Sequence, residues 1–348
     1  MPHIHVIYSG GTIGMTESPQ GRQPAGDLLP RLQAAAGQRL DRLADQGITW
    51  ELTPLAPLID SAEASPTTWR ALAHAVLRAS VSADGVVLLH GTDTLAPSGA
   101  ALSFALRGLG KPVVLTGAQN PLGDAQGHAA DNVLLALQAA AEPPLRNEVV
   151  LAFGGQLLRA NRCLKWSTRA AEAFISPNWP ALGEAQAGGD LRLNPAALLQ
   201  PNAVAPTPTG LPMVPERLPS IGLLRLHPGI DIARWQAWLA VRPLDGLVLH
   251  TYGSGNAPVT STALVALVER CVAQGTVVVN VTQCPHGSVD LHAYASASPL
   301  SAVGVIGAAD MTAGCALAKL DWLFGCLPPE ARAAQFVTAL CGEATLAP

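Results

Sequence analysis

Charged residues are scarce in this sequence: Asp, Glu, Lys and Arg together make up only 13% of the 348 residues, and the net charge is −4. No block of basic residues occurs, so nothing in the chain attracts nucleic acid or an anionic membrane. No apolar run approaches the roughly 20 residues of a membrane-spanning helix. The composition therefore excludes nucleic-acid and membrane partners. With 49% hydrophobic residues it is typical of an α/β protein with buried strands.

The six cysteines lack the patterns that make a disulfide framework or a zinc site. They show no C-x-x-C spacing and no clustered histidines, so we expect reduced, mostly buried thiols, with Cys284 as a buried structural one. The N-terminus shows no charged segment followed by an apolar one, which is the pattern of a secretory signal. We therefore expect a cytoplasmic protein.

The length of the chain favours two domains, because one hydrophobic core rarely extends over 348 residues. Short β-branched runs alternate with amphipathic stretches, as in a parallel sheet covered by helices. Ser65 and Pro66 have the chemistry of a helix start. In the first part of the chain we predict strands over 3–9, 86–89, 112–116 and 149–153, an extended segment over 50–58, and helices from 66, over 98–109 and over 129–141.

A proline-rich stretch separates the two predicted domains. Residues 195–219 contain seven prolines and few charges, which predicts a linker between domains over 1–194 and 220–348. The predicted fold is α/β: two α/β domains with mainly parallel sheets, a larger N-terminal catalytic domain and a smaller C-terminal one. In the second domain we predict strands over 221–226, 246–250, 276–281 and 303–306 and helices over 262–274, 311–324 and 329–340.

Two predicted strand ends carry threonines. Residues 90–94 (HGTDT) follow the apolar run 85–89, and residues 9–14 (SGGTIG) follow the first strand. Open α/β sheets bind ligands at the carboxyl ends of their strands, so hydroxyls and a carboxylate at two such ends indicate paired chemistry. The alternative is that the polar residues of the HGTDT segment only cap the next helix. A dinucleotide-binding fingerprint is not met, because Thr12 stands in place of its second glycine.

Residues 8–15 and 90–95 resemble the two signatures of the bacterial-type L-asparaginases. The resemblance covers nearly the whole chain and includes, in order, 57–61, 110–117, 161–165, 227–229, 252–258 and 282–284. The last two segments, with the missing signal pattern, are more similar to the cytoplasmic type I branch than to the periplasmic type II branch. The resemblance implies hydrolysis of the side-chain amide of L-asparagine to L-aspartate and ammonia, with no metal and no cofactor.

The resemblance also implies which residues do this chemistry. Ser61 and Asp93 match positions that hold the α-carboxylate and α-ammonium groups of the substrate. Asn256 matches a position that reaches the active site of a neighbouring subunit, which implies a homodimer or homotetramer with intersubunit active sites. The implied catalytic residues are Thr12, Thr92, Asp93 and Lys165. The implied substrate-binding residues are Gly11, Asp60, Ser61, Gly91 and Asn256.

Three of these residues also have plainer interpretations. Lys165 on its own is typical of a solvated lysine, and Ser61 of a turn residue. Asn256 lies in a Gly-Ser-Gly-Asn segment and is typical of a left-handed turn conformation.

Amide hydrolysis needs an activated nucleophile, an oxyanion site and a proton for the departing ammonia. Burial lowers the pKa of a lysine, whereas a neighbouring carboxylate favours its charged form, so we expect a proton relay Thr92–Lys165–Asp93. In the mechanism we favour, Thr12 forms an acyl-enzyme that relay-activated water hydrolyses, with backbone N–H groups holding the oxyanion. In the alternative, the relay activates water directly and Thr12 only polarises the amide; the sequence does not separate the two.

The sequence departs from the family pattern beside Thr12. Residues 15–27 are polar and rich in Gly and Pro, which predicts a lid loop. The family's lid usually carries a tyrosine, and Arg22 holds its place here; an arginine cannot share a proton as a phenol does. A triplet that relatives carry as Ala/Ser-Asp-Gly is replaced by residues 127–129, although Asn132 is kept. These departures bear on efficiency and substrate choice more than on the fold.

Two other functions compete with the hydrolase. One is the asparaginase-like subunit of a tRNA-dependent amidotransferase, which normally carries an extra N-terminal module, whereas the first strand here is predicted to begin at His3. The other is a catalytically silent amino-acid-binding protein, a hypothesis suggested by Arg22. Release of ammonia from asparagine separates an enzyme from a binding protein.

Overall fold

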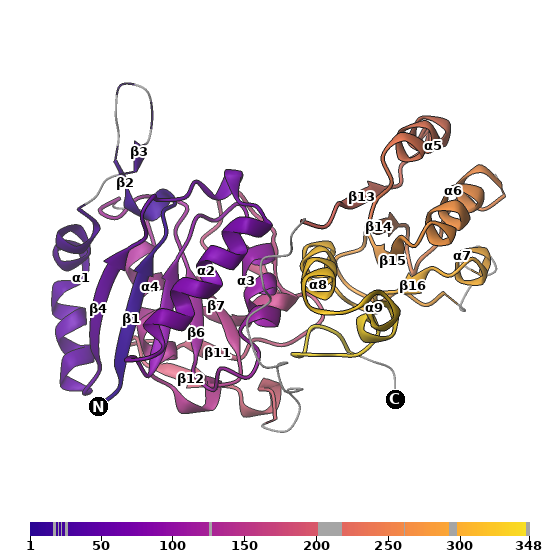
Figure 1. Cartoon of the computed structure of the whole chain (residues 1–348). Helices are drawn as coiled ribbons and strands as arrows, with labels where there is room; N and C mark the ends of the chain where they lie inside the picture. The colour runs from indigo at the N-terminus through magenta and orange to yellow at the C-terminus, as the bar shows by residue number, and fades with distance from the viewer. Residues whose placement is uncertain are drawn as a thin grey trace. The chain divides into compact units, whose positions relative to one another are not determined.

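A computed structural model of the chain describes residues 1–16, 19, 21, 23–24, 27–124, 127–200, 218–260, 262–291 and 298–345. The chain forms two compact units, Met1–Thr209 and Gly210–Pro348 (Figure 1). Both units are built from helices and mainly parallel sheets, which confirms the predicted fold class. The finer boundaries predicted at residues 194 and 219 stay a prediction, since 201–217 lie outside the described residues.

Unit 1 contains an eight-stranded sheet with the order β12-β11-β8-β7-β6-β5-β1-β4. The strands β4, β1, β5, β6 and β7 are parallel, and β8, β11 and β12 extend the sheet antiparallel. The central strands β5, β6 and β7 are buried along their whole length, as their continuous apolar runs predict. The bounds are β1 His3–Tyr8, β4 Thr49–Pro54, β5 Gly85–Leu89, β6 Val113–Thr116, β7 Val149–Phe153, β8 Gln156–Arg159, β11 Gly183–Ala185 and β12 Leu191–Leu193.

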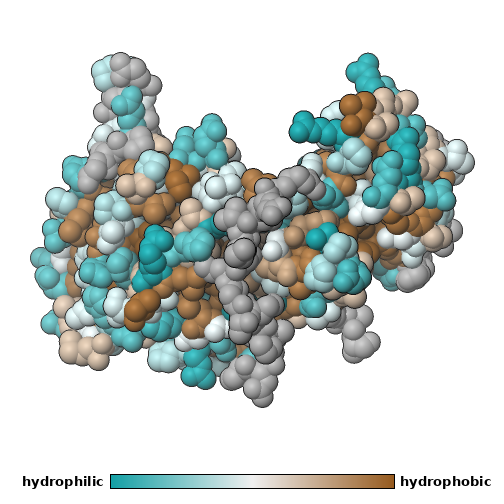
Figure 2. Space-filling model, in the orientation of Figure 1, coloured by the Kyte–Doolittle hydropathy of each residue, from teal (hydrophilic) through white to brown (hydrophobic). Residues whose placement is uncertain are grey.

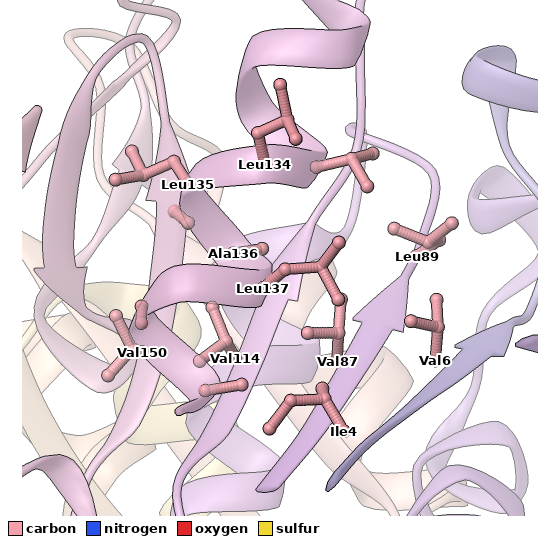
Figure 3. Close-up of a cluster of buried hydrophobic side chains, with 14 of the residues drawn as sticks. Ile4, Val6, Val87, Leu89, Val114, Leu134, Leu135, Ala136, Leu137 and Val150 are labelled. Atoms are coloured by element: carbon pink, nitrogen blue, oxygen red, sulfur yellow. The ribbon is translucent and has the colours of Figure 1, made fainter. Parts of the chain in front are cut away.

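Helices pack on this sheet and bury a large apolar core. Figure 3 shows Ala136 and Leu137 of α4 facing Val87 and Val114 on the central strands. The helices are α1 Leu28–Asp45, α2 Pro66–Ala79, α3 Leu95–Ala105 and α4 Ala129–Ala140. Single turns of 3-10 helix are η1 Thr12–Gly14, η2 Ser61–Glu63, η3 Pro143–Leu145, η4 Ala160–Arg162 and η5 Pro195–Ala197. Two short pairs complete the unit: β2 Met15–Thr16 with β3 Gln23–Pro24, and β9 Leu164–Lys165 with β10 Phe174–Ile175.

The helix starts of unit 1 show where the sequence prediction holds and where it fails. The α2 helix begins as predicted, because Ser65 and Thr68 form a reciprocal capping box with Pro66 in the first turn. The α3 helix begins at Leu95 and not at the predicted residue 98. The side chain of Leu95 is fully buried. The α1 helix and the strands β8, β10, β11 and β12 of unit 1 were not predicted.

Unit 2 contains a four-stranded parallel sheet with the order β13-β14-β15-β16. Its last strand is shorter and later than the predicted 303–306, and its α5 helix was not predicted. The α5 helix is capped by Asp231, whose carboxylate accepts from the backbone N–H of Arg234. The strands are β13 Ile221–Arg225, β14 Gly246–Thr251, β15 Val277–Thr282 and β16 Ile306–Gly307. The helices are α5 Ile232–Val241, α6 Thr262–Ala273, α7 Ser298–Ala302, α8 Ala313–Cys326 and α9 Pro329–Phe336.

Hydrophilic and hydrophobic side chains are mixed over the visible surface (Figure 2). Within the described ranges, every helix is too short or too polar to cross a bilayer. None of the described cysteines forms a disulfide, and Cys163 is buried. The prediction of a buried Cys284 is wrong: this thiol is exposed and lies in the bends that follow the end of β15 at Thr282.

A buried ion pair ties the end of unit 2 to α8. Lys319 and Glu343 are both fully buried, and the Lys319 ammonium lies 2.6 Å from the Glu343 carboxylate. Burial raises the pKa of Glu343, but Lys319 and two backbone N–H donors more than offset this, so its pKa lies below the ordinary value of 4.5.

We expect Lys319→Met to lower the free energy of unfolding by about 3–5 kcal/mol, because it leaves an unpaired buried carboxylate. Urea denaturation measures this loss. Glu343 is more acidic when folded, so its contribution to stability is complete above about pH 4.5 and is lost as the pH falls further. The double variant Lys319→Met, Glu343→Gln should regain part of the loss at neutral pH. A single variant as stable as the wild type would contradict the assignment.

Candidate active site

The two threonine-bearing segments leave the same edge of the unit 1 sheet. The strands β1 and β5 are parallel neighbours, and Tyr8 pairs with Leu89 at their carboxyl ends. Beyond them, Ser9 donates its backbone N–H and its hydroxyl to the carbonyl of Leu89, at 2.9 and 2.8 Å. The sheet register therefore brings the Thr12 and Thr92 segments together, as the sequence predicts.

Two glycines allow the segments to touch. A Cβ on Gly11 would lie 2.5 Å from the Cα of Gly91, and Gly11 has a φ of 91°. Any larger residue at position 11 would be strained and would push the two loops apart. Thr12 and Thr92 each follow directly after this backbone contact.

Thr12 is the first residue of η1 and is partly exposed, whereas Ile13 and Gly14 behind it are buried. A Cβ on Gly14 would lie 2.0 Å from the phenol oxygen of Tyr8, so only glycine fits there. The carbonyl of Ile13 accepts from the backbone N–H of Leu122 at 3.0 Å. The buried Ile13 residue thus anchors the turn, while Thr12 remains partly exposed.

Lys165 joins the second segment from β9. Its ammonium nitrogen donates to the Thr92 hydroxyl at 2.9 Å and to the Asp93 carboxylate at 2.7 Å. The Lys165 side chain is 21% exposed and Asp93 is 64% exposed, so this ion pair faces solvent on one side. The interpretation of Lys165 as a free solvated lysine is therefore wrong. The three residues form the contacts that a proton relay requires.

The neighbouring histidine fixes the backbone of this segment. His90 is buried, and its Nδ1 lies 2.7 Å from the carbonyl oxygen of Gly91, so Nδ1 carries the hydrogen. Burial lowers the pKa of His90 below its ordinary value, although the hydrogen bond acts in the opposite direction. A neutral imidazole therefore holds the Gly91 peptide. No motif in the sequence predicts this role for His90.

The predicted substrate-binding residues Asp60 and Ser61 reach the same edge. The backbone N–H of Ile59 donates to the carbonyl of Ser9 at 2.7 Å and brings this segment in. Ser61 is buried, and a Cβ on Gly91 would lie 2.3 Å from its hydroxyl oxygen. Asp60 is exposed and caps η2 by accepting from the N–H of Ala62. Ser61 is thus both a turn residue and a neighbour of the HGTDT segment.

Thr94 does not make the hydrogen bond that the helix-capping alternative requires. It stands at the N-cap position of α3, but its hydroxyl donates to the carbonyl of Ser61 at 2.7 Å and makes no cap hydrogen bond. The alternative that the polar residues of the segment only cap the helix therefore fails for Thr94.

The structure does not test the roles implied for Asn256 and Arg22. Asn256 belongs to unit 2, where its carbonyl accepts from the N–H of Tyr252 at 3.0 Å. The interpretation of Asn256 as a left-handed turn residue is wrong, since Gly253 and Gly255 take the positive φ angles, 45° and 114°. Arg22 lies outside the described residues.

Two further features complete the geometry. Asn132 of α4 donates its amide to the carbonyl of Gly117 at 2.9 Å and accepts from the N–H of Gly154 at 3.0 Å, which ties the loops after β6 and β7 together. Among the described residues, no group of three or more His, Cys, Asp or Glu side chains is placed to hold a metal ion.

The chain resembles characterised proteins over nearly its whole length. Residues 3–198 match the family described as Asparaginase, N-terminal, and residues 220–335 match the Glutaminase/Asparaginase C-terminal domain. L-asparaginase 1 of Escherichia coli (strain K12) is 40% identical over 327 residues, which cover 92% of this chain and 91% of that protein.

Solved structures agree with this match. L-asparaginase I from Vibrio cholerae superposes with a TM-score of 0.82 at 34% identity and covers 99% of both chains. The thermostable L-asparaginase from Thermococcus kodakarensis superposes with a TM-score of 0.85 at 30% identity and covers 99% of this chain and 100% of its own. This chain therefore belongs to the asparaginase family.

Proposed function

We propose that this chain is an L-asparaginase that hydrolyses the side-chain amide of L-asparagine to L-aspartate and ammonia. The observation that carries the proposal is the contact of Lys165 with both Thr92 and Asp93, at the sheet edge that also carries the Thr12 turn. The 40% identity to an L-asparaginase over 92% of the chain supports it. The reaction needs no cofactor, since water is the second substrate.

Thr12 is the proposed nucleophile. Its oxygen attacks the amide carbon, the C–N bond breaks, and the hydroxyl proton ends on the departing ammonia. The resulting aspartyl ester is then hydrolysed by water, which releases aspartate and restores the Thr12 hydroxyl. Backbone N–H groups at the two strand ends hold the oxyanion of each step.

Lys165, Thr92 and Asp93 form the proposed proton relay. An amine accepts a proton only in its neutral form, and the Asp93 carboxylate at 2.7 Å favours the charged form. The Thr92 hydroxyl lies 2.9 Å from the same nitrogen and can pass a proton through its own oxygen. As the activated water passes a proton to Thr92, the Thr92 proton passes to Lys165 and a Lys165 proton passes to Asp93. The Asp93 carboxylate is the final acceptor, and the relay needs no permanently free amine.

Substrate binding uses the residues around the glycine contact. Asp93 is assigned to the α-ammonium group and Ser61 to the α-carboxylate, with Gly11, Gly91 and Asp60 lining the same edge. Asn256 is assigned to the active site of a second copy, so the active form is a homodimer or homotetramer. We place the enzyme in the cytoplasm, as a type I member.

Ammonia release from the purified protein tests the proposal. We expect equimolar ammonia and aspartate from L-asparagine, and the same assay with L-glutamine and D-asparagine defines the preference. Binding of L-asparagine in calorimetry without ammonia release would instead identify a catalytically silent binding protein.

The lid position gives a separate prediction. We expect Arg22→Tyr to raise kcat on L-asparagine, because a phenol can close over the nucleophile and share a proton, whereas an arginine cannot share a proton in this way. Steady-state kinetics measure the change, and Gln20→Tyr in the same loop is the control. A kcat/KM at least tenfold lower, a loss of about 1.4 kcal/mol, would show that Arg22 contacts the substrate.

A further inference from the structure

Arg31 of α1 makes hydrogen bonds with three separate backbone carbonyls near the Thr12 turn. One terminal nitrogen of its guanidinium donates to Gly14 at 3.0 Å, and the other donates to Met15 at 2.9 Å and to Leu122 at 3.1 Å. The Arg31 side chain is 19% exposed and lies 3.8 Å from the Asp27 carboxylate one turn earlier. Its charge is thus directed mainly at backbone oxygens.

The three carbonyls belong to three different structural elements. Gly14 is the last residue of η1, the turn that begins at Thr12. Met15 begins β2, which pairs with β3 and forms the root of the predicted lid (Figure 1). Leu122 belongs to the loop after β6 and also donates its own N–H to Ile13. Arg31 therefore joins the nucleophile turn, the lid root and a neighbouring loop.

The chemistry of this contact requires a guanidinium group. Its planar fork presents several N–H donors in fixed directions, whereas an ammonium is a compact point charge on a flexible stem. The carbonyls at the end of a short helical turn lack intrahelical partners, so a cation there satisfies them. Gly14 also packs closely against the Tyr8 phenol, and its N–H donates to the Gly11 carbonyl at 3.2 Å. Removing Arg31 would take away the donor that binds the Gly14 carbonyl at the end of the Thr12 turn.

We propose that Arg31 is a positioning residue for the reaction: it fixes the Thr12 turn to the lid root and so aligns the nucleophile with the amide carbon. The inference rests on the proposed function, because it concerns the alignment of Thr12. The hydrogen bonds of Arg31 go to Gly14, Met15 and Leu122, whereas the proposed substrate contacts Ser61 and Asp93 belong to other segments. Its loss should therefore lower kcat and leave KM nearly unchanged.

Steady-state kinetics of Arg31→Ala on L-asparagine test this inference. We expect kcat to fall about 100-fold, the effect of misplacing a reacting group by about 1 Å, with KM changed less than threefold. Guanidinium ion at millimolar concentration, far below denaturing levels, should restore at least a tenth of the lost kcat by occupying the vacated position. A residue that only stabilises the fold would not show this separation of kcat from KM.

Two further variants keep the test decisive. Arg31→Lys preserves the charge and a stem of similar length, so this variant should fold. Its kcat should be at least tenfold lower than that of the wild type and should not rise when guanidinium is added. Arg39→Ala is the matched control, since Arg39 lies on the same helix and pairs with Asp131 at the surface. It should keep the kcat of the wild type.

The outcomes separate this inference from the proposed function. A wild-type protein that releases no ammonia overturns the proposed function and this inference with it. An active wild type with an Arg31→Lys variant of unchanged kcat overturns this inference alone. The same holds if the Arg31→Ala variant folds and loses affinity instead of kcat.

Discussion

Replacing Thr12 with alanine should lower kcat on L-asparagine by about 10⁴-fold or more, equivalent to about 5.4 kcal/mol of transition-state stabilisation. Thr12 begins η1 and is partly exposed at the sheet edge, so no core contact is lost. The turn remains anchored by Ile13 in the core and by the Arg31 contacts. The expected result is an inactive enzyme with an unchanged thermal midpoint.

A conservative replacement is the control for this experiment. Thr12→Ser keeps the hydroxyl and should retain measurable turnover, whereas Thr12→Val keeps the shape and should not. Ammonia release near the wild-type rate in Thr12→Ala would show that Thr12 is neither the nucleophile nor an essential polariser of the amide.

Thr92→Val and Lys165→Met should each lower kcat about 10³-fold or more. The kcat of the double variant should be no lower than that of the less active single variant. Lys165 contacts the Thr92 hydroxyl at 2.9 Å, so removal of either residue interrupts the same proton path. Residues that act as a unit show such non-additive losses. The cycle of four proteins is measured by ammonia release at saturating asparagine.

A lysine from another part of unit 1 is the control for this cycle. Lys111 donates to the carbonyls of Ser80 and Ala83, at 2.6 and 2.7 Å, outside the two catalytic segments. Lys111→Met should cost stability and leave kcat unchanged. Losses that multiply in the Thr92→Val, Lys165→Met double variant would exclude a shared relay.

The sequence indicated the site because parallel strands impose simple geometry. Once residues 3–8 and 85–89 are taken as neighbouring parallel strands, their carboxyl ends must meet, and the Thr12 and Thr92 segments follow directly. The glycines at 11 and 91 could be anticipated from the same reasoning, since the two loops touch there. Lys165 is different: its place beside Thr92 was implied only by the family resemblance, because 73 residues separate the two.

The features that sequence reasoning missed depend on weaker or longer-range signals. The α1 helix buries residues at positions 28, 32, 36, 40 and 43, a helical spacing that was present but interrupted by Pro30 and Gly37. The strands β10, β11 and β12 are two or three residues long, too short for a visible alternation. The three contacts of Arg31 are with backbone carbonyls, which leave no trace in residue identity.

The predictions for Cys284 and Asn256 fail because both depend on the local path of the backbone. Cys284 lies in the exposed bends that follow the end of β15, a boundary that hydropathy alone did not reveal. The left-handed conformation expected of Asn256 falls instead on Gly253 and Gly255, since glycine adopts it without steric cost.

Mass spectrometry of the Thr92→Val variant, quenched in acid during its first turnover of L-asparagine, tests the proposed nucleophile most directly. The proposed mechanism separates attack by Thr12 from hydrolysis by relay-activated water, and loss of the relay should slow the second step. The predicted result is about one equivalent of ammonia per chain, with one aspartyl group bound as an ester to the peptide that contains Thr12. Release of ammonia with Thr12 unmodified at every quench time would contradict the mechanism and show direct attack by water.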